Sequence, residues 1–183
     1  MTTECPAPDG SSPKRQSFDG PPPMCIDPAK RYTADMITSK GTIRIALDPV
    51  AAPKTVNNFV YLSQYHFYDG VTFHRVIPGF VVQGGDPQGT GMGGPGYQFA
   101  DELPKAGAYK VGSLAMANSG PNTNGSQFFI ITGTQGTQLP PNYSLFGNVI
   151  SGMDVVKKIE ADGAQSGTPT KVHKMNKVTI TES

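Results

Sequence analysis

Residues 73–86 read Phe-His-Arg-Val-Ile-Pro-Gly-Phe-Val-Val-Gln-Gly-Gly-Asp, and this stretch is the most informative part of the chain. The apolar runs at 71–76 and 80–83 predict two short strands. They place one cation, Arg75, and one neutral amide, Gln83, among aromatic and branched apolar residues. Such surroundings suit a reaction that needs a few well-placed hydrogen bonds in a dry pocket. The stretch contains no obvious nucleophile and no set of metal ligands.

Outward from this stretch, the chain predicts many short strands and only two helices. Alternation at 32–48 around the turn at 39–41 predicts a hairpin, and further strands are expected at 110–117, 127–132, 145–149 and 172–181. Apolar residues at helical spacing predict a helix that opens at Pro53 and ends near Gln64, and a second helix over 153–161. The glycine-rich residues 84–96 are expected to form a loop. This pattern favours a mainly β fold, a closed or nearly closed antiparallel barrel.

Composition excludes several classes of function. The formal net charge is +1 and 16% of the residues are charged, so no basic face for nucleic acid is expected. No apolar run approaches the roughly 18 residues that would span a membrane. The first residues, Met-Thr-Thr-Glu-Cys-Pro, have neither the basic start nor the apolar stretch of a signal peptide, which predicts a cytoplasmic protein.

Residues 1–28 differ from the remainder and predict an N-terminal extension ahead of a domain at 29–183. They are rich in Pro, Gly, Ser and Asp, which is the composition of a tail or linker with little to bury. Both cysteines, Cys5 and Cys25, lie in this extension. They are either two idle thiols or a disulfide that closes a loop of about 20 residues and stabilises it by ~3 kcal/mol. A disulfide would favour the alternative of an extracytoplasmic or secreted protein.

The sequence offers no metal, cofactor or nucleophile site. The histidines, His66, His74 and His173, show no metal-ligand spacing, and no serine sits in a G-x-S-x-G elbow. Residues 89–94 match G-x-G-x-x-G, but Pro95-Gly96 follows where a dinucleotide site needs a helix. His74 is either an acid/base group or a structural imidazole that orients its neighbours, and the structural role is favoured.

A second informative segment covers residues 114–129, with apolar residues on both sides of a polar turn. Two strands joined by such a loop would bring Asn118 and Gln127 to the same surface. An ordinary hairpin with a polar connection fits the composition equally well.

Together the segments Phe73–Asp86 and Met116–Phe129 resemble the two signature segments of the cyclophilins. The similarity extends to Ala52–Phe59, Phe67–Gly70, Gly96–Glu102 and Phe146-Gly147, and it covers about residues 31–183. Cyclophilins are peptidyl-prolyl cis/trans isomerases. The resemblance implies a closed eight-stranded antiparallel barrel capped by two α-helices, with the site on the outer face of the barrel. It implies isomerisation of X-Pro bonds, assistance to protein folding, and no cofactor. A proline-peptide binding or chaperone module with little turnover is the alternative.

The resemblance also assigns roles to particular residues. Arg75 would stabilise the twisted amide, Gln83 would hold the Arg75 fork, and Asn118 would bind the peptide before proline through its backbone. The proline pocket and its surroundings would be formed by Phe73, His74, Phe80, Val81, Met116, Ala117, Gln127, Phe129, Leu139 and Tyr143.

Departures from the commonest family pattern concern the rim of the pocket. Gln138 stands where many relatives carry Trp, and Tyr143 stands where His is usual. Because the family uses that Trp to bind cyclosporin, weakened cyclosporin affinity is expected. The expected partners are proline-containing peptides and unfolded proteins, and a monomer is the simpler expectation.

Overall fold

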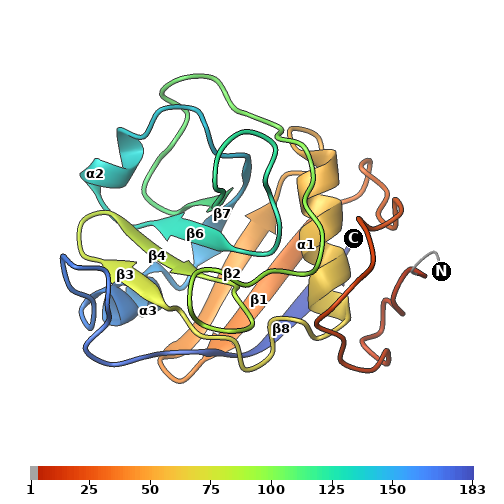
Figure 1. Ribbon diagram of the computed structural model, residues 1–183, viewed down its shortest axis with the longest axis horizontal. Coiled ribbons are helices and arrows are strands. Elements are labelled where there is room, and N and C mark those ends of the chain that lie inside the picture. Colours follow the sequence, from red (N-terminus) through yellow and green to blue (C-terminus); the bar gives the residue numbers. More distant parts are fainter. Residues whose placement is uncertain (1–3) are drawn as a thin grey trace.

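In the computed structural model, which describes residues 4–183, one antiparallel sheet of eight strands curls into a barrel (Figure 1). Its order is β3-β4-β6-β5-β7-β2-β1-β8. The strands are β1 (Tyr32–Thr38), β2 (Gly41–Leu47), β3 (Arg75–Ile77), β4 (Val81–Gly84), β5 (Ser113–Met116), β6 (Phe128–Ile131), β7 (Leu145–Ser151) and β8 (Met175–Glu182). The predicted hairpin is confirmed, because β1 and β2 pair across the turn at 39–41. Met1–Thr3, the start of the predicted extension, lie outside the described residues.

The barrel is less completely closed than expected. No regular ladder between the edge strands β3 and β8 is recorded in the described residues. Instead, the segment at 70–73 bonds to the residues around the start of β8. The Gly70 N–H donates to the Met175 carbonyl at 2.6 Å, and the Phe73 N–H donates to the His173 carbonyl at 2.9 Å. These main-chain bonds protect the two sheet edges without a long ladder.

The two predicted helices are confirmed, and the described residues contain a third. Helix α1 (Pro53–Gln64) has proline in its first turn, and α3 (Met153–Glu160) turns Val155, Val156 and Ile159 into the core. The additional helix, α2 (Thr134–Thr137), is a single turn of four residues. A single turn is too short to show helical periodicity in the sequence, which is why it escaped prediction.

Residues 4–28 pack closely on α1, so the expectation of a linker with little to bury is wrong. Phe18 is 3% exposed and Ile26 is 8% exposed. The Phe18 ring lies 5.1 Å from the Tyr61 ring and 5.6 Å from the Tyr65 ring, centroid to centroid. In Figure 1 this segment (red) runs alongside α1. The helix is therefore covered on both sides.

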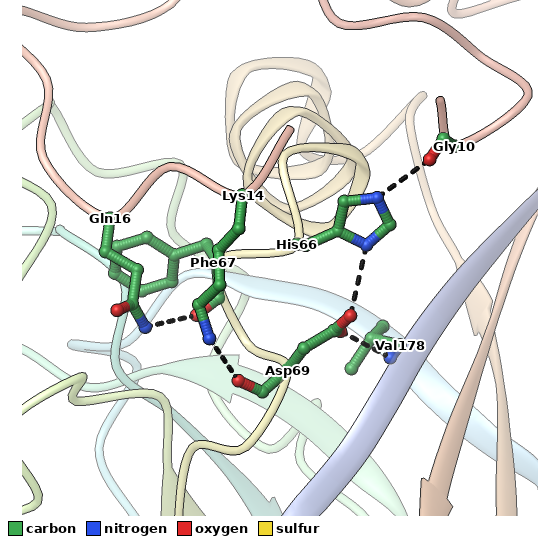
Figure 2. Close-up of polar contacts among 7 residues, drawn as sticks. All are labelled: Gly10, Lys14, Gln16, His66, Phe67, Asp69 and Val178. Atoms are coloured by element: carbon green, nitrogen blue, oxygen red, sulfur yellow. Dashed lines mark hydrogen bonds and ion pairs between the residues drawn. The ribbon is translucent and has the colours of Figure 1, made fainter. Parts of the chain in front are cut away.

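Hydrogen bonds fasten the extension to the turn that follows α1 (Figure 2). The His66 imidazole lies between the Gly10 carbonyl, 2.8 Å from Nε2, and the Asp69 carboxylate, 3.0 Å from Nδ1. Asp69 also accepts a hydrogen bond from the Val178 N–H at 3.1 Å, which connects the turn to β8. The extension adds two side-chain donors: Lys14 Nζ to the Asp69 carbonyl at 2.6 Å and Gln16 Nε2 to the Phe67 carbonyl at 2.9 Å.

A disulfide between Cys5 and Cys25 closes the extension into a loop, with the two Cα atoms 5.6 Å apart. Asn57 of α1 holds the far end of this loop. Its side-chain oxygen accepts from the Cys25 N–H at 2.7 Å, and its amide donates to the Pro23 carbonyl at 2.9 Å. We call residues 5–25 the N-terminal disulfide loop.

Removal of the disulfide is expected to destabilise the protein. A Cys5→Ser/Cys25→Ser variant should lose about 3 kcal/mol of unfolding free energy, because its unfolded chain is no longer cross-linked. Urea unfolding measures this difference. Reductant should lower the midpoint of the wild type to that of the variant and leave the variant unchanged. Equal midpoints for the variant and the oxidised wild type would contradict the expectation.

Candidate active site

The outer face of β4, β5 and β6 carries the candidate site because side chains alternate across each strand. Val82, Phe128 and Leu114 point into the main core, whereas Val81, Phe129 and Ala115 form a separate apolar cluster. The register pairs Gln83 with Phe129 and Phe129 with Ala115. Leu139 and Tyr143, from the loops that follow β6, pack against part of this face and help to bury the cluster.

A small cavity of about 160 Å³ opens on this face. It brings together nine residues that the sequence had nominated from four distant segments. They are Arg75, Phe80, Val81, Gln83, Ala117, Asn118, Phe129, Leu139 and Tyr143. The Phe129 and Tyr143 rings meet nearly at right angles, with centroids 5.4 Å apart. We call this cavity the apolar pocket after its aromatic and aliphatic side chains, beside which Arg75, Gln83 and Asn118 contribute polar groups.

A chain of hydrogen bonds orients Arg75. Arg75 on β3 stands directly opposite Gln83 on β4, and its Nη1 donates to Gln83 Oε1 at 3.1 Å. The Gln83 amide in turn donates to Gln127 Oε1 at 3.2 Å. Gln127 donates to the Gly91 carbonyl at 2.9 Å and to the Gly93 carbonyl at 3.0 Å. Gln83 therefore holds the guanidinium, and Gln83 is held in turn by Gln127, which is bonded to the glycine-rich main chain.

Two further contacts position Arg75, and the sequence reasoning missed one of them. The guanidinium carbon lies 5.9 Å from the centre of the Phe80 ring, within reach of a cation–π attraction. Gly167 packs under the stem of Arg75: a Cβ added there would lie 3.2 Å from Arg75 Cγ. Only the fold brings Gly167 to this place, because nothing in the residues around it marks a site.

Tyr109 is a second residue that the sequence reasoning missed. Its hydroxyl donates to the Tyr143 carbonyl at 2.6 Å and accepts from the Tyr143 N–H at 3.1 Å. Burial raises the pKa of Tyr109, which keeps the hydroxyl protonated and able to donate. Tyr109 thus fixes the main chain of the residue that forms one wall of the pocket.

The side-chain amide of Asn118 is used to shape the neighbouring loops. Its Nδ2 donates to the Asn142 carbonyl at 2.9 Å, and its Oδ1 accepts from the Gly120 N–H at 3.1 Å. This arrangement fits a role for Asn118 through its main chain.

Four nominated residues do not line the apolar pocket. Phe73 and Met116 are each 0% exposed and belong to the main core, so they support the site from inside the barrel and cannot touch a ligand. Met116 points inward because it shares a face of β5 with Leu114, whereas Phe73 precedes β3 and turns its ring into the core there. Gln127 lines a second cavity, and His74 lies next to Gly91 in the lining of that cavity: a Cβ added at Gly91 would lie 3.6 Å from His74 Nε2.

The second cavity adjoins the apolar pocket and has a volume of about 600 Å³. We call it the polar groove. It shares Gln83, Ala117 and Asn118 with the apolar pocket, and the glycine-rich residues 91–98 form one of its walls. The next regular element after those glycines is β5.

Asp86 organises the glycine-rich wall and is 1% exposed. Its carboxylate accepts main-chain N–H bonds from Gln88 at 2.8 Å, Thr90 at 3.0 Å, Gly91 at 2.6 Å and Gly93 at 3.1 Å. Burial acts to raise the pKa of Asp86, but these donors outweigh it and lower the pKa below its ordinary value. The carboxylate is therefore ionised and keeps the loop folded back on itself.

The surroundings of His74 favour its neutral imidazole. Its pKa is lowered, chiefly by burial, with a smaller contribution from the charge of Arg75 and an opposing one from Asp86. Within the described residues its Nδ1 has no hydrogen-bond partner, so a second ring proton would be buried without an acceptor.

Residues 4–183 contain neither a cluster of metal-binding side chains nor a helix that could span a membrane. This part of the chain holds no cluster of three or more His, Cys, Asp or Glu side chains that could bind a metal ion. None of its helices combines the length and the apolar character that crossing a membrane requires.

The sequence of this chain is similar to that of one family of known proteins. Residues 33–182 match the family described as Cyclophilin type peptidyl-prolyl cis-trans isomerase/CLD. The chain is 47% identical over 157 residues to the Peptidyl-prolyl cis-trans isomerase A of Mycobacterium tuberculosis, covering 74% of this chain and 86% of that protein. It is 44% identical over 169 residues to the Probable peptidyl-prolyl cis-trans isomerase A of Mycobacterium leprae, covering 81% of this chain and 91% of that protein.

Solved structures of cyclophilin type isomerases also resemble this chain in fold. A crystal structure of a Cryptosporidium parvum cyclophilin type peptidyl-prolyl cis-trans isomerase aligns with a TM-score of 0.77 at 35% identity, covering 84% of this chain and 99% of that chain. A crystal structure of the same Cryptosporidium parvum protein in the presence of the dipeptide Ala-Pro aligns with a TM-score of 0.76, covering 82% of this chain and 99% of that chain.

The lowered pKa of His74 predicts a pH dependence of stability. The unfolded state, with an ordinary pKa of 6.5, binds a proton more readily than the folded state. The contribution of His74 to the unfolding free energy should therefore rise as pH increases from the lowered pKa toward 6.5, and stay level above it.

A His74→Gln variant isolates this contribution, because it keeps every other titrating group. Urea unfolding at pH 5 and pH 7.5 should show a smaller gain of stability on raising the pH in the variant than in the wild type. An equal or larger gain in the variant would show that the folded state does not disfavour protonation of His74.

Proposed function

The chain belongs to the cyclophilin-type peptidyl-prolyl cis-trans isomerases, and we propose that it catalyses rotation about X-Pro bonds with Arg75 as the central group. The observation that carries this proposal is the placement of the Arg75 guanidinium. Gln83 holds it at the edge of a pocket with three apolar side chains, Phe80, Phe129 and Leu139.

The chemistry of the reaction explains why so few polar groups suffice. The barrier to rotation about a peptide bond is about 18–20 kcal/mol, because the nitrogen lone pair is delocalised into the carbonyl. Both isomers of an X-Pro bond are populated, yet they exchange only in tens to hundreds of seconds. A catalyst needs no covalent step. It must bind the twisted amide more tightly than either planar form, and an acceleration of ~10⁵ corresponds to about 7 kcal/mol.

Arg75 can supply this preference. In the twisted amide the lone pair is localised on the prolyl nitrogen, which becomes a hydrogen-bond acceptor that the planar amide does not offer. A guanidinium N–H aimed at that nitrogen binds the transition state selectively, and a partly dry site strengthens such a charge-assisted bond. The same cation donates to the substrate carbonyl.

The other residues bind and orient the substrate. The proline ring enters between Phe80, Phe129 and Leu139, with Val81 on the wall of the pocket. Asn118 binds the residue that precedes proline through its main chain. Tyr143 reaches across the pocket, and Ala117, His74 and Gln127 surround it. Phe73 and Met116 hold the sheet beneath from the core.

The alternative is a module that binds proline-containing segments without useful turnover. The apolar pocket alone would serve such a module. The hydrogen-bond chain that fixes Arg75 favours catalysis, because binding a proline ring does not need an oriented guanidinium.

Several further properties are proposals of the same kind. The clients are proline-containing segments of peptides and of unfolded proteins, bound by a monomer. The Cys5–Cys25 disulfide supports an oxidising, extracytoplasmic location over the cytoplasm. The match over 33–182 supports a domain at 29–183 with an extension at 1–28.

The rim of the pocket bears on inhibitor binding. Gln138 is exposed, directly before Leu139 of the pocket. We propose weaker cyclosporin binding than in relatives that carry Trp there, which titration of both proteins with cyclosporin measures.

The role of Arg75 is tested by an Arg75→Ala variant. Its kcat/KM should fall at least 100-fold, the scale on which removal of one transition-state donor acts, while its urea unfolding stays close to that of the wild type. NMR exchange on a capped Ala-Pro peptide measures turnover without a helper protease.

Arg44→Ala is the matched control. Arg44 is an exposed arginine on β2 that pairs with Asp35, with Nε and Oδ1 2.8 Å apart, and it lies outside the pocket. The control should keep full activity. Near-wild-type rates in Arg75→Ala would refute the assignment.

A further inference from the structure

One wall of the polar groove is made of backbone that needs external support. Residues 89–96 contain five glycines, Gly89, Gly91, Gly93, Gly94 and Gly96. Glycine gains more conformational freedom than any other residue when it is released from a fixed structure. Asp86 holds the beginning of this segment. The Asp86 bonds reach residues 88–93 only, so other contacts hold the far end of the wall at 95–97.

Phe18 of the N-terminal disulfide loop holds that far end. Its N–H donates to the Pro95 carbonyl at 2.9 Å. The Phe18 carbonyl lies so close to Gly96 that a Cβ added there would approach it to 2.4 Å. The Phe18 ring also meets the Tyr97 ring edge-on, with centroids 6.3 Å apart. One extension residue therefore touches three successive residues of the groove wall.

These contacts continue through Tyr97 to another part of the groove lining. The Tyr97 hydroxyl donates to Asn58 Oδ1 of α1. The Asn58 amide donates to the Gly125 carbonyl at 2.9 Å, and Gly125 lines the groove beside Pro95. Phe18 thus packs against a bonded unit that joins Tyr97, α1 and Gly125.

The extension can act as a rigid support because it is itself fastened. The Arg15 N–H donates to the Tyr65 carbonyl at 2.9 Å, and the Gly10 carbonyl lies 2.8 Å from His66 Nε2, in the turn that follows α1 (Figure 2). The Cys5–Cys25 disulfide closes the loop on either side of Phe18. The support therefore comes from outside the region that matches the family, which begins at residue 33.

We propose that Phe18 is a positioning residue for substrate selection, which raises affinity for peptides that extend beyond the proline pocket. This rests on the proposed function, in which Asn118 binds the residue before proline. Because Asn118 lines both cavities, residues further upstream in the peptide enter the polar groove. Without the Phe18 ring, which anchors this main chain against Tyr61, Tyr65 and Tyr97, the glycine-rich wall must be ordered when the peptide binds, and that ordering reduces affinity.

The test compares two capped probe peptides, acetyl-Ala-Pro-Phe-amide and acetyl-Phe-Leu-Ala-Pro-Phe-amide. NMR titration of the whole protein gives Kd for each. The wild type should bind the longer probe more tightly. Phe18→Ala should weaken binding of the longer probe at least three-fold and leave that of the shorter probe unchanged. Phe18→Leu, which keeps most of the apolar volume, should lie between the two and serves if the Ala variant does not fold.

Ile26→Ala is the matched control. Ile26 is buried in the same extension, but it lies just after the N-terminal disulfide loop, where its N–H bonds to Asn57 Oδ1 at 3.2 Å. Both probes should bind this control as they bind the wild type.

Three results would overturn the proposal: equal affinity of the wild type for the two probes, equal changes for both probes in the Phe18 variants, or the same selective loss in Ile26→Ala. Failure of the proposed function is a separate result, in which both probes bind and neither shows accelerated cis/trans exchange.

Discussion

The hydrogen bond from Arg75 to Gln83 is the interaction on which the site depends. It exists because β3 and β4 pair in a register that sets these two residues opposite each other. A shift of one residue would turn Gln83 into the core and bring an apolar side chain to the surface, so burial of the alternating residues enforces the register. The stability of the barrel and the orientation of the guanidinium thus have the same origin.

Much of this arrangement is readable in the sequence. The bounds of α1 follow from proline at its start and apolar spacing along it, and the outer-face site follows from the resemblance of 73–86 and 116–129 to known segments. Phe73 and Met116 were nominated because they sit inside those segments. Their inward orientation depends on which face of each strand is buried, and a motif does not state that.

Features that depend on contacts between distant segments could not be predicted from the sequence. The extension has a linker composition, yet Phe18 is buried because α1 offers Tyr61 and Tyr65 as a surface for it. Gly167 and Tyr109 support Arg75 and Tyr143 from places that no local pattern marks. The single-turn α2 is too short to show a helical period in the sequence. The partial closure between β3 and β8 has no periodic pattern either, because it depends on a few main-chain bonds between distant segments.

We propose that the Gln83 amide orients Arg75 for the transition state. A Gln83→Met variant keeps the length of the side chain and removes the amide. Saturation kinetics by NMR exchange on a short X-Pro peptide should show kcat reduced about ten-fold or more, about 1.4 kcal/mol, with KM within about two-fold of the wild type. An unchanged kcat would contradict the claim, because Arg75 would then find its position without Gln83.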